Sequence, residues 1–114
     1  MNGVHPHVVL HLGLNCREPT GRDLTAYLRK AVPFYQSLSG VNVRLFRSLD
    51  RPGRFAEIIE YTTEEAFRAD QIRVADDKQM QGFLAQWREL LTQPPEVEHF
   101  ADITAAIAEG ARDA

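Results

Sequence analysis

Residues 54–67 read RFAEIIEYTTEEAF, a strand pattern that runs without a gap into the start of a helix. The apolar residues Phe55, Ile58, Ile59 and Tyr61 mark the strand. The segment 62–65 then has the form of a capping box, in which Thr62 accepts a hydrogen bond from the N3 amide and Glu65 reaches back. We therefore predict a strand that ends at Tyr61 and a helix that follows it directly.

The preceding segment predicts a hairpin with this strand. Val41, Val43 and Leu45 alternate with polar residues, as in a strand with one apolar face. The intervening residues 50–53 are Asp-Arg-Pro-Gly, whose proline and glycine suit a tight turn.

The amino-terminal part of the chain predicts a strand over residues 8–15 and a helix after the loop 17–21. The strand residues of one parity are all aliphatic. The helix is indicated by apolar residues at intervals of three and four: Leu24, Tyr27, Leu28, Ala31, Phe34, Tyr35 and Leu38. Pro33 lies inside this pattern and should kink the helix or cost it a hydrogen bond, while Gly40 is placed to end the helix as its C′ residue.

The second helix is predicted in two parts. Its apolar pattern lapses around residues 75–77 and resumes at Met80, so that Asp76 is a candidate cap for the second part. Pro94 and Pro95 end it. A fourth strand follows over residues 97–103, and the Ala-rich tail 105–114 is compatible with a short, frayed helix.

The order β-α-β-β-α-β predicts an α+β, ferredoxin-like fold, in which two helices cover one face of a four-stranded antiparallel sheet. The other face stays uncovered. Val9 and Phe46 would lie on it, together with either Phe55 and Ile59 or Ala56 and Ile58. Because an exposed apolar sheet face favours association, we expect a homodimer through this face.

Length and composition indicate one ordinary globular domain over residues 1–114, with a core spanning about 8–103. The net charge of −3 argues against nucleic acid as a partner. No targeting pattern or membrane span is evident, so a cytoplasmic location without membrane association is expected. The lone Cys16 fits a reducing compartment, and we interpret it as an ordinary residue at a strand end.

The hairpin 43–47 and 54–61, followed at once by residues 62–67, resembles the dimeric α/β-barrel superfamily and, within it, the antibiotic-biosynthesis-monooxygenase-like domains. The resemblance covers residues 8–103. It implies two ferredoxin-like chains that close their sheets face to face, with a substrate between sheet and helices. The superfamily also contains cyclase-like, haem-degrading and haem-binding members, so it does not decide the chemistry.

His11 and Asn15 alternate with the aliphatic residues of the first strand, and in a barrel of this kind they would point inward. We list His11 and Asn15 with Tyr61 and Trp87 as catalytic candidates; for His11 the alternative is a polar contact at the dimer seam. His5, His7 and His11 share strand parity, but His7 and His11 would lie roughly 13 Å apart in an extended strand, too far for one ion. No metal site is predicted.

The hairpin also carries two arginines and two glutamates. With a turn centred on Pro52, Arg47 would face Glu57 and Arg44 would face Glu60 in cross-strand ion pairs. A shift by one residue would turn the third strand over. In the alternative interpretation, one arginine and one glutamate lie in the cleft, where burial shifts their protonation.

Further ligand-binding candidates are aromatic or imidazole side chains. An aromatic stripe at helical spacing is compatible with core packing or with a pocket wall. His99 on the fourth strand is compatible with core, interface or catalysis. The ligand-binding candidates are Tyr35, Arg44, Phe46, Glu57, Phe83 and His99.

Three functions remain open. The first is a cofactor-independent, monooxygenase-like enzyme that acts on a small aromatic or polyketide-type molecule; the absence of a phosphate-cradling loop accords with no bound cofactor. The second is a non-catalytic dimeric binding module. The third is haem binding or degradation with His11 or His99 as axial ligand. The sequence alone does not decide whether the chain is an enzyme.

Overall fold

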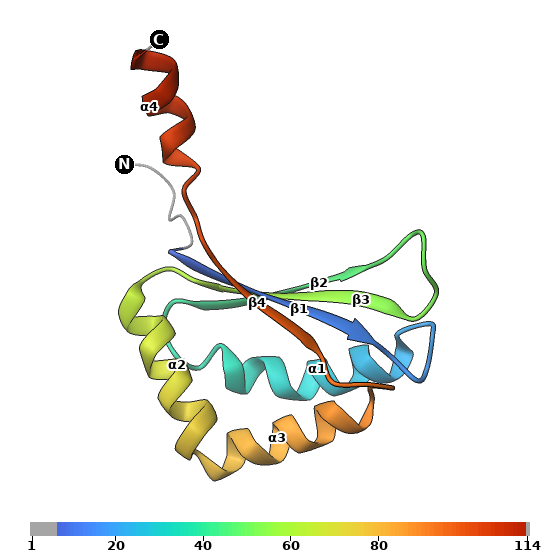
Figure 1. Ribbon diagram of the computed structural model, residues 1–114. Helices are drawn as coiled ribbons and strands as arrows, with labels where there is room; N and C mark the ends of the chain where they lie inside the picture. Colours follow the sequence, from blue (N-terminus) through green and yellow to red (C-terminus); the bar gives the residue numbers. More distant parts are fainter. Residues whose placement is uncertain (1–6, 114) are drawn as a thin grey trace.

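The computed structural model describes residues 7–113 and has the predicted α+β, ferredoxin-like fold (Figure 1). The elements are β1 (Val8–Asn15), α1 (Arg22–Tyr35), β2 (Val41–Arg47), β3 (Arg54–Tyr61), α2 (Glu64–Asp76), α3 (Lys78–Glu89), β4 (Glu96–Ala101) and α4 (Ala105–Asp113). The strands form one antiparallel sheet in the order β2-β3-β1-β4. Helices α1, α2 and α3 all lie against the same face of this sheet (Figure 1).

The register assigns each strand residue to one face. Leu12 in β1 pairs with Glu57 in β3, and Leu14 pairs with Phe55. These residues face the helices and, except for the glutamate, belong to the hydrophobic core. The aliphatic residues of the alternation predicted for residues 8–15 thus lie on the side of the central strand β1 that faces the core.

No part of the chain that the structure describes covers the opposite face of the sheet. Of the two predicted sets, Ala56 and Ile58 lie on it, since they pair with Gly13 and His11 of β1. Phe46 and Phe100 share this open face and are each 45% exposed.

The hairpin register differs from that of a turn centred on Pro52. Arg47 pairs with Phe55 and Arg44 with Ile58, two residues away from the expected partners. The chain turns between Ser48 and Arg54, where the Ser48 amide donates to the Arg54 carbonyl over 2.8 Å. A shift of two preserves the faces, and Arg44 still reaches Glu60 diagonally at 3.8 Å.

Two helix caps lie one residue further along than predicted. Thr63, not Thr62, caps α2 by accepting from the Ala66 amide over 3.0 Å. The break between α2 and α3 is where the apolar pattern lapses, but Asp77 caps α3, not Asp76, and accepts from the Met80 amide over 2.9 Å. In both pairs the second residue has the extended backbone that an N-cap requires.

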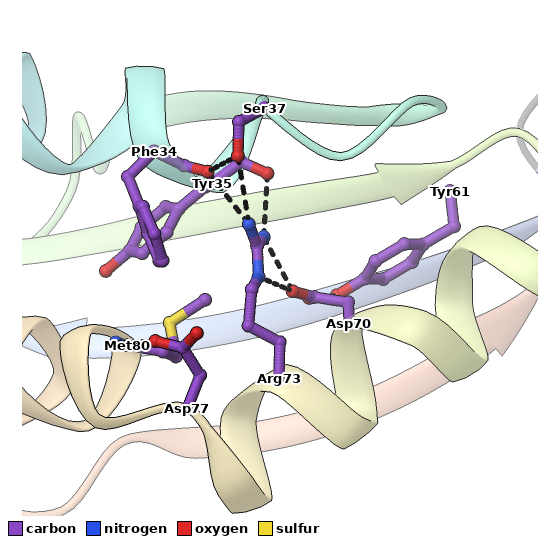
Figure 2. A network of polar contacts seen from close by, with 8 residues as sticks. All are labelled: Phe34, Tyr35, Ser37, Tyr61, Asp70, Arg73, Asp77 and Met80. Atoms are coloured by element: carbon purple, nitrogen blue, oxygen red, sulfur yellow. Dashed lines mark hydrogen bonds and ion pairs between the residues drawn. The ribbon is translucent and has the colours of Figure 1, made fainter.

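Helix α1 ends at Tyr35, earlier than Gly40 suggested. The prediction that Gly40 is its C′ residue is wrong: Gly40 adopts a positive φ of 85° beside the start of β2. The reason is a side chain from α2. The Arg73 guanidinium donates to the carbonyls of Phe34 and Tyr35 over 2.8 and 2.7 Å, so these groups need no further helical turn (Figure 2).

Strand β4 is shorter than the predicted 97–103 and leads into an arm. The Asp102 amide donates to the His7 carbonyl over 3.2 Å, and the Asp102 carboxylate accepts from the Thr104 amide over 2.9 Å. The chain turns there into α4, which stands away from the sheet and the other helices (Figure 1). Within the described range, no helix combines the length and apolar character needed to cross a membrane.

Candidate functional site

A cavity of about 250 Å³ lies between the sheet and the helices, where the resemblance predicted a substrate. Its apolar wall comes from β1, β2, β3 and the facing helices. The apolar residues on this wall are Leu10, Leu12, Val41, Ile59, Met80 and Leu84. The volume falls just below the range of about 300–1,000 Å³ typical of drug-sized ligands, so it suits a molecule of one or two rings.

Glu57 is the most distinctive group in this cavity. It stands in β3 between Leu12 of β1 and Leu45 of β2, and its side chain is 2% exposed. One carboxylate oxygen, Oε1, accepts a hydrogen bond from Trp87 Nε1 over 3.0 Å. Trp87 reaches this oxygen because α3, capped by Asp77, is a separate helix from α2 and turns its apolar side toward the sheet.

Within the described residues, no group donates a hydrogen bond to the second oxygen of Glu57, Oε2, and no side-chain oxygen or nitrogen that is fully buried lacks a partner. Oε2 is therefore not fully buried, and since Glu57 lines the cavity, we infer that Oε2 faces it. Burial raises the pKa of Glu57 to about 7, and the Trp87 hydrogen bond opposes this rise. The cavity therefore contains a carboxyl group that changes its protonation near neutral pH and is directed at any bound molecule.

Two tyrosines bring hydroxyl groups to the wall. Tyr61 donates to Asp70, and Asp70 also accepts from Arg73 Nη2 over 2.8 Å (Figure 2). Tyr35 contacts the hydroxyl of Tyr27 at 2.5 Å. Because Tyr27 donates its own proton to the Phe83 carbonyl over 2.7 Å, the proton between the two tyrosines belongs to Tyr35.

Both wall tyrosines stay protonated at neutral pH. Burial raises the pKa of Tyr35 to about 12, and the negative charge of Glu57 acts in the same direction. Burial, with the hydrogen bond to Asp70, also raises the pKa of Tyr61. These hydroxyls are hydrogen-bonding groups and not bases.

The cavity opens toward α2, α3 and β4. The residues of this rim are Gln71, Val74, Arg88, Pro95, Val97 and His99. Val97 is 53% exposed, and His99 packs edge-on to Phe67 with 5.8 Å between ring centroids. A ligand can therefore enter beside the edge strand β4.

The structure divides the predicted site residues between the two faces of the sheet. Tyr35, Glu57, Tyr61, Trp87 and His99 line the cavity. Phe83 lies directly behind it, 6.2 Å from the Tyr35 ring.

The remaining candidates lie on the open face. His11 packs edge-on to Phe100 and shares a hollow at the hairpin end with Phe46. Arg44 stacks on Phe46 at 4.9 Å. Asn15 has its Cα paired with Arg54, and its carbonyl accepts from Thr92 over 2.8 Å. His11 and Asn15 thus share no cavity with Tyr61 and Trp87.

Of the residues that raised the metal question, His5 lies outside the described residues and His7 contacts Glu64 at 3.6 Å. Cys16 is buried, and burial raises the pKa of its thiol to about 11. A thiol with so high a pKa suits the interpretation of an ordinary residue.

Sequence reasoning missed Asp70 and Arg73. Asp70 is 5% exposed and follows Ala66 by one helical turn on the buried side of α2. A charged residue in phase with an apolar stripe was the available signal.

The sequence matches no family model and no curated protein. Its structure is similar to a protein from Bordetella bronchiseptica proposed to be an antibiotic biosynthesis monooxygenase, with a TM-score of 0.69 and 20% identity over 87% of this chain and 99% of that one. It is also similar to SnoaB, a cofactor-independent oxygenase from Streptomyces nogalater, with a TM-score of 0.68 and 17% identity over 86% and 94%. The chain has the fold of the antibiotic biosynthesis monooxygenases.

A third similar structure is Rv0793 from Mycobacterium tuberculosis, with a TM-score of 0.64 and 26% identity over 84% of this chain and 94% of that one. The predicted resemblance is confirmed at the level of the fold. The shared fold does not identify the ligand of the cavity.

Proposed function

We propose that the chain binds a small aromatic molecule in the cavity and oxygenates it without a bound cofactor. The observation that carries this proposal is the Glu57 carboxylate oxygen directed into an apolar space. A base with a pKa near 7 is well matched to accept a proton at neutral pH. The similarity to a cofactor-independent oxygenase supports the reaction class.

In this reaction, a phenolic or enolic hydroxyl of the substrate donates to Glu57 Oε2 and passes its proton to it. The total charge in the cavity is unchanged, because the carboxyl becomes neutral as the substrate becomes an anion. The electron-rich anion then supplies all four electrons that reduce molecular oxygen: a C–H carbon of the substrate becomes a carbonyl carbon and keeps one oxygen atom. The other oxygen atom leaves as water with two protons, the one held by Glu57 and the one released from that carbon, so Glu57 returns to its carboxylate form. The apolar wall excludes bulk water from the anion.

Oxygen uptake with a panel of hydroquinones and phenols tests this function. The wild type is expected to consume oxygen with one of them and to incorporate one labelled oxygen atom into the product. Glu57→Gln should lose this activity, since an amide accepts no proton. Arg44→Ala, on the open face, is the matched control and should retain it.

Binding without oxygen uptake would contradict the enzymatic proposal. It would favour the second candidate, a non-catalytic binding module, which the same cavity supports.

We also propose that two chains associate through the open sheet face. Phe46, Phe100 and Ile58 lie there together, uncovered by any other part of the described chain. Burying this face would remove apolar surface from water.

A further inference from the structure

Hydrogen-bond donors inside the cavity are already used by the protein. Trp87 donates its only N–H to Glu57. Tyr61 donates to Asp70, beside which it lies in Figure 2. Tyr35 donates to Tyr27. The two tyrosines therefore offer only oxygen lone pairs toward the cavity, and Trp87 offers no further N–H. The side-chain donors that remain, Gln71, Arg88 and His99, lie at the rim, so the part of the cavity around Glu57 accepts hydrogen bonds.

The charges point the same way. Glu57 and Asp70 both line the cavity, and only Asp70 has a cationic partner. That partner, Arg73, is fully engaged: it donates to Asp70 and to the carbonyls of Phe34 and Tyr35. Among the described residues, no arginine, lysine or histidine forms an ion pair with Glu57, and this includes the rim residue Arg88.

A buried carboxylate without a cation is electrostatically unfavourable, and a ligand that brings a positive charge removes this penalty. The wall also includes the aromatic residues Tyr35, Tyr61 and Trp87. Aromatic rings attract cations electrostatically, and this attraction grows when water is excluded.

We propose that the cavity binds small organic cations, namely protonated primary or secondary amines on an apolar body, with the ammonium group donating to Glu57 Oε2. The apolar body lies against Leu10, Leu12 and Met80. Such amines would occupy the same cavity as the substrate of the proposed oxygenation, but they would not be oxygenated. An amine of matching size is therefore also expected to inhibit that reaction competitively.

The pH dependence of amine binding follows from the charge of Glu57. Below a pKa of about 7 the carboxyl is protonated and must release its proton when the ammonium binds. Amine affinity should therefore fall by about tenfold per pH unit on the acidic side and level off on the alkaline side. The other titratable or charged groups around the cavity are Tyr35, Tyr61, Asp70, Arg73, Arg88 and His99.

Calorimetric titration of three probes that share a 2-phenylethyl body and differ in charge tests the proposal: 2-phenylethylamine, 2-phenylethanol and 3-phenylpropionate. The measurements are made without oxygen, so they do not depend on the oxygenation reaction. The amine is expected to bind about tenfold to a hundredfold more tightly than the alcohol, as for hydrogen bonds to charged groups, and the anion most weakly.

Glu57→Gln should bring amine and alcohol to similar affinity and abolish the pH dependence, while its thermal unfolding midpoint verifies that it is folded. Glu65→Gln makes the same change at an exposed glutamate in the first turn of α2, outside the cavity, and should retain both the preference and the pH profile. Equal affinities for the three probes in the wild type, or a preference for the anion, would overturn the proposal. So would an amine preference that survives in Glu57→Gln. None of these results would affect the separate oxygen-uptake assay, so the oxygenation proposal can hold even if the amine proposal fails.

Discussion

Glu57 occupies a position of β3 at which strand alternation would favour an apolar residue. Its neighbours on the same face, Phe55 and Ile59, are apolar, and Leu12 and Leu45 flank it on the adjoining strands. A carboxyl group kept there, with a single hydrogen bond from Trp87, costs stability when it is ionised. This cost is measurable, and its size reports how dry the cavity is.

Glu57→Gln should remove the pH dependence that this residue gives to stability. Folding raises the pKa of Glu57 from 4.5 to about 7. The folded wild type therefore has its full stability below pH 4.5, the pKa in the unfolded state, and loses stability as the pH rises from there to 7. The loss should reach about 3 kcal/mol above that range. Denaturant unfolding of both proteins across pH measures it: the free energies of unfolding should run together below about pH 4.5, diverge from there to about pH 7, and stay a constant distance apart above that. Parallel curves would contradict the assignment.

At the scale of elements, Arg73 joins α2 to the end of α1. Its guanidinium neutralises Asp70, satisfies two carbonyls of α1 and stacks on the Phe34 ring at 4.8 Å (Figure 2). The side chain of Arg73 is 9% exposed and that of Asp70 is 6% exposed. A pair so deeply buried depends strongly on both partners.

Arg73→Met should destabilise the fold by about 3–5 kcal/mol, because Asp70 is then left buried without a cation. The double variant Arg73→Met with Asp70→Asn should recover part of this loss. Arg68→Ala removes an exposed ion pair with Glu64 and serves as the control, with an expected effect of about 0.5 kcal/mol or less. Equilibrium unfolding measures all three. A loss for Arg73→Met as small as that of Arg68→Ala would contradict the buried pair.

The break between α2 and α3 has its own test. Asp77→Ala should cost about 1 kcal/mol, because the Met80 amide loses its acceptor. Asp76→Ala is the matched control and should be nearly neutral, since Asp76 ends α2 and caps nothing. If the costs were reversed in thermal unfolding, the cap would be the one expected from sequence.

Periodicity predicted the strands and the broken second helix. For β1, β3 and α3 the reason is that one apolar side is buried in the core, whereas β4 shows the alternation although all its residues are exposed. It did not decide between Thr62 and Thr63, or between Asp76 and Asp77. Neighbouring residues of the same type have the same capping chemistry, and only the backbone conformation selects one of them. The end of α1 also could not be predicted, because it depends on Arg73, distant in sequence.

At the scale of the whole molecule, the sheet separates two surfaces with different properties. The helix side encloses the cavity with Glu57, Tyr61 and Trp87. The open side carries His11 and Asn15. All of these residues were predicted from the sequence as site candidates. Assigning each of them to one face of the sheet required the strand register, which the turn residues alone did not specify.

The open face is expected to form a homodimer. Ile58→Asp should yield monomers in light scattering at concentrations at which the wild type is dimeric, because a carboxylate would be buried in the contact. Leu49→Asp is the control: Leu49 is 89% exposed at the hairpin, outside the sheet face, and its replacement should leave the dimer intact. A monomeric wild type, or a dimeric Ile58→Asp, would contradict this interface.

The central claim is that the cavity contains a desolvated carboxyl group ready to meet a ligand. Carbon-13 NMR titration of the glutamate carboxyl groups tests it most directly, with Glu57→Gln identifying the signal and Trp87→Phe removing the hydrogen bond that lowers its pKa. The wild-type signal should titrate with a midpoint near 7 and move higher in Trp87→Phe. A midpoint near the ordinary value of 4.5 would mean that water reaches Glu57 freely, and would contradict the account of this site.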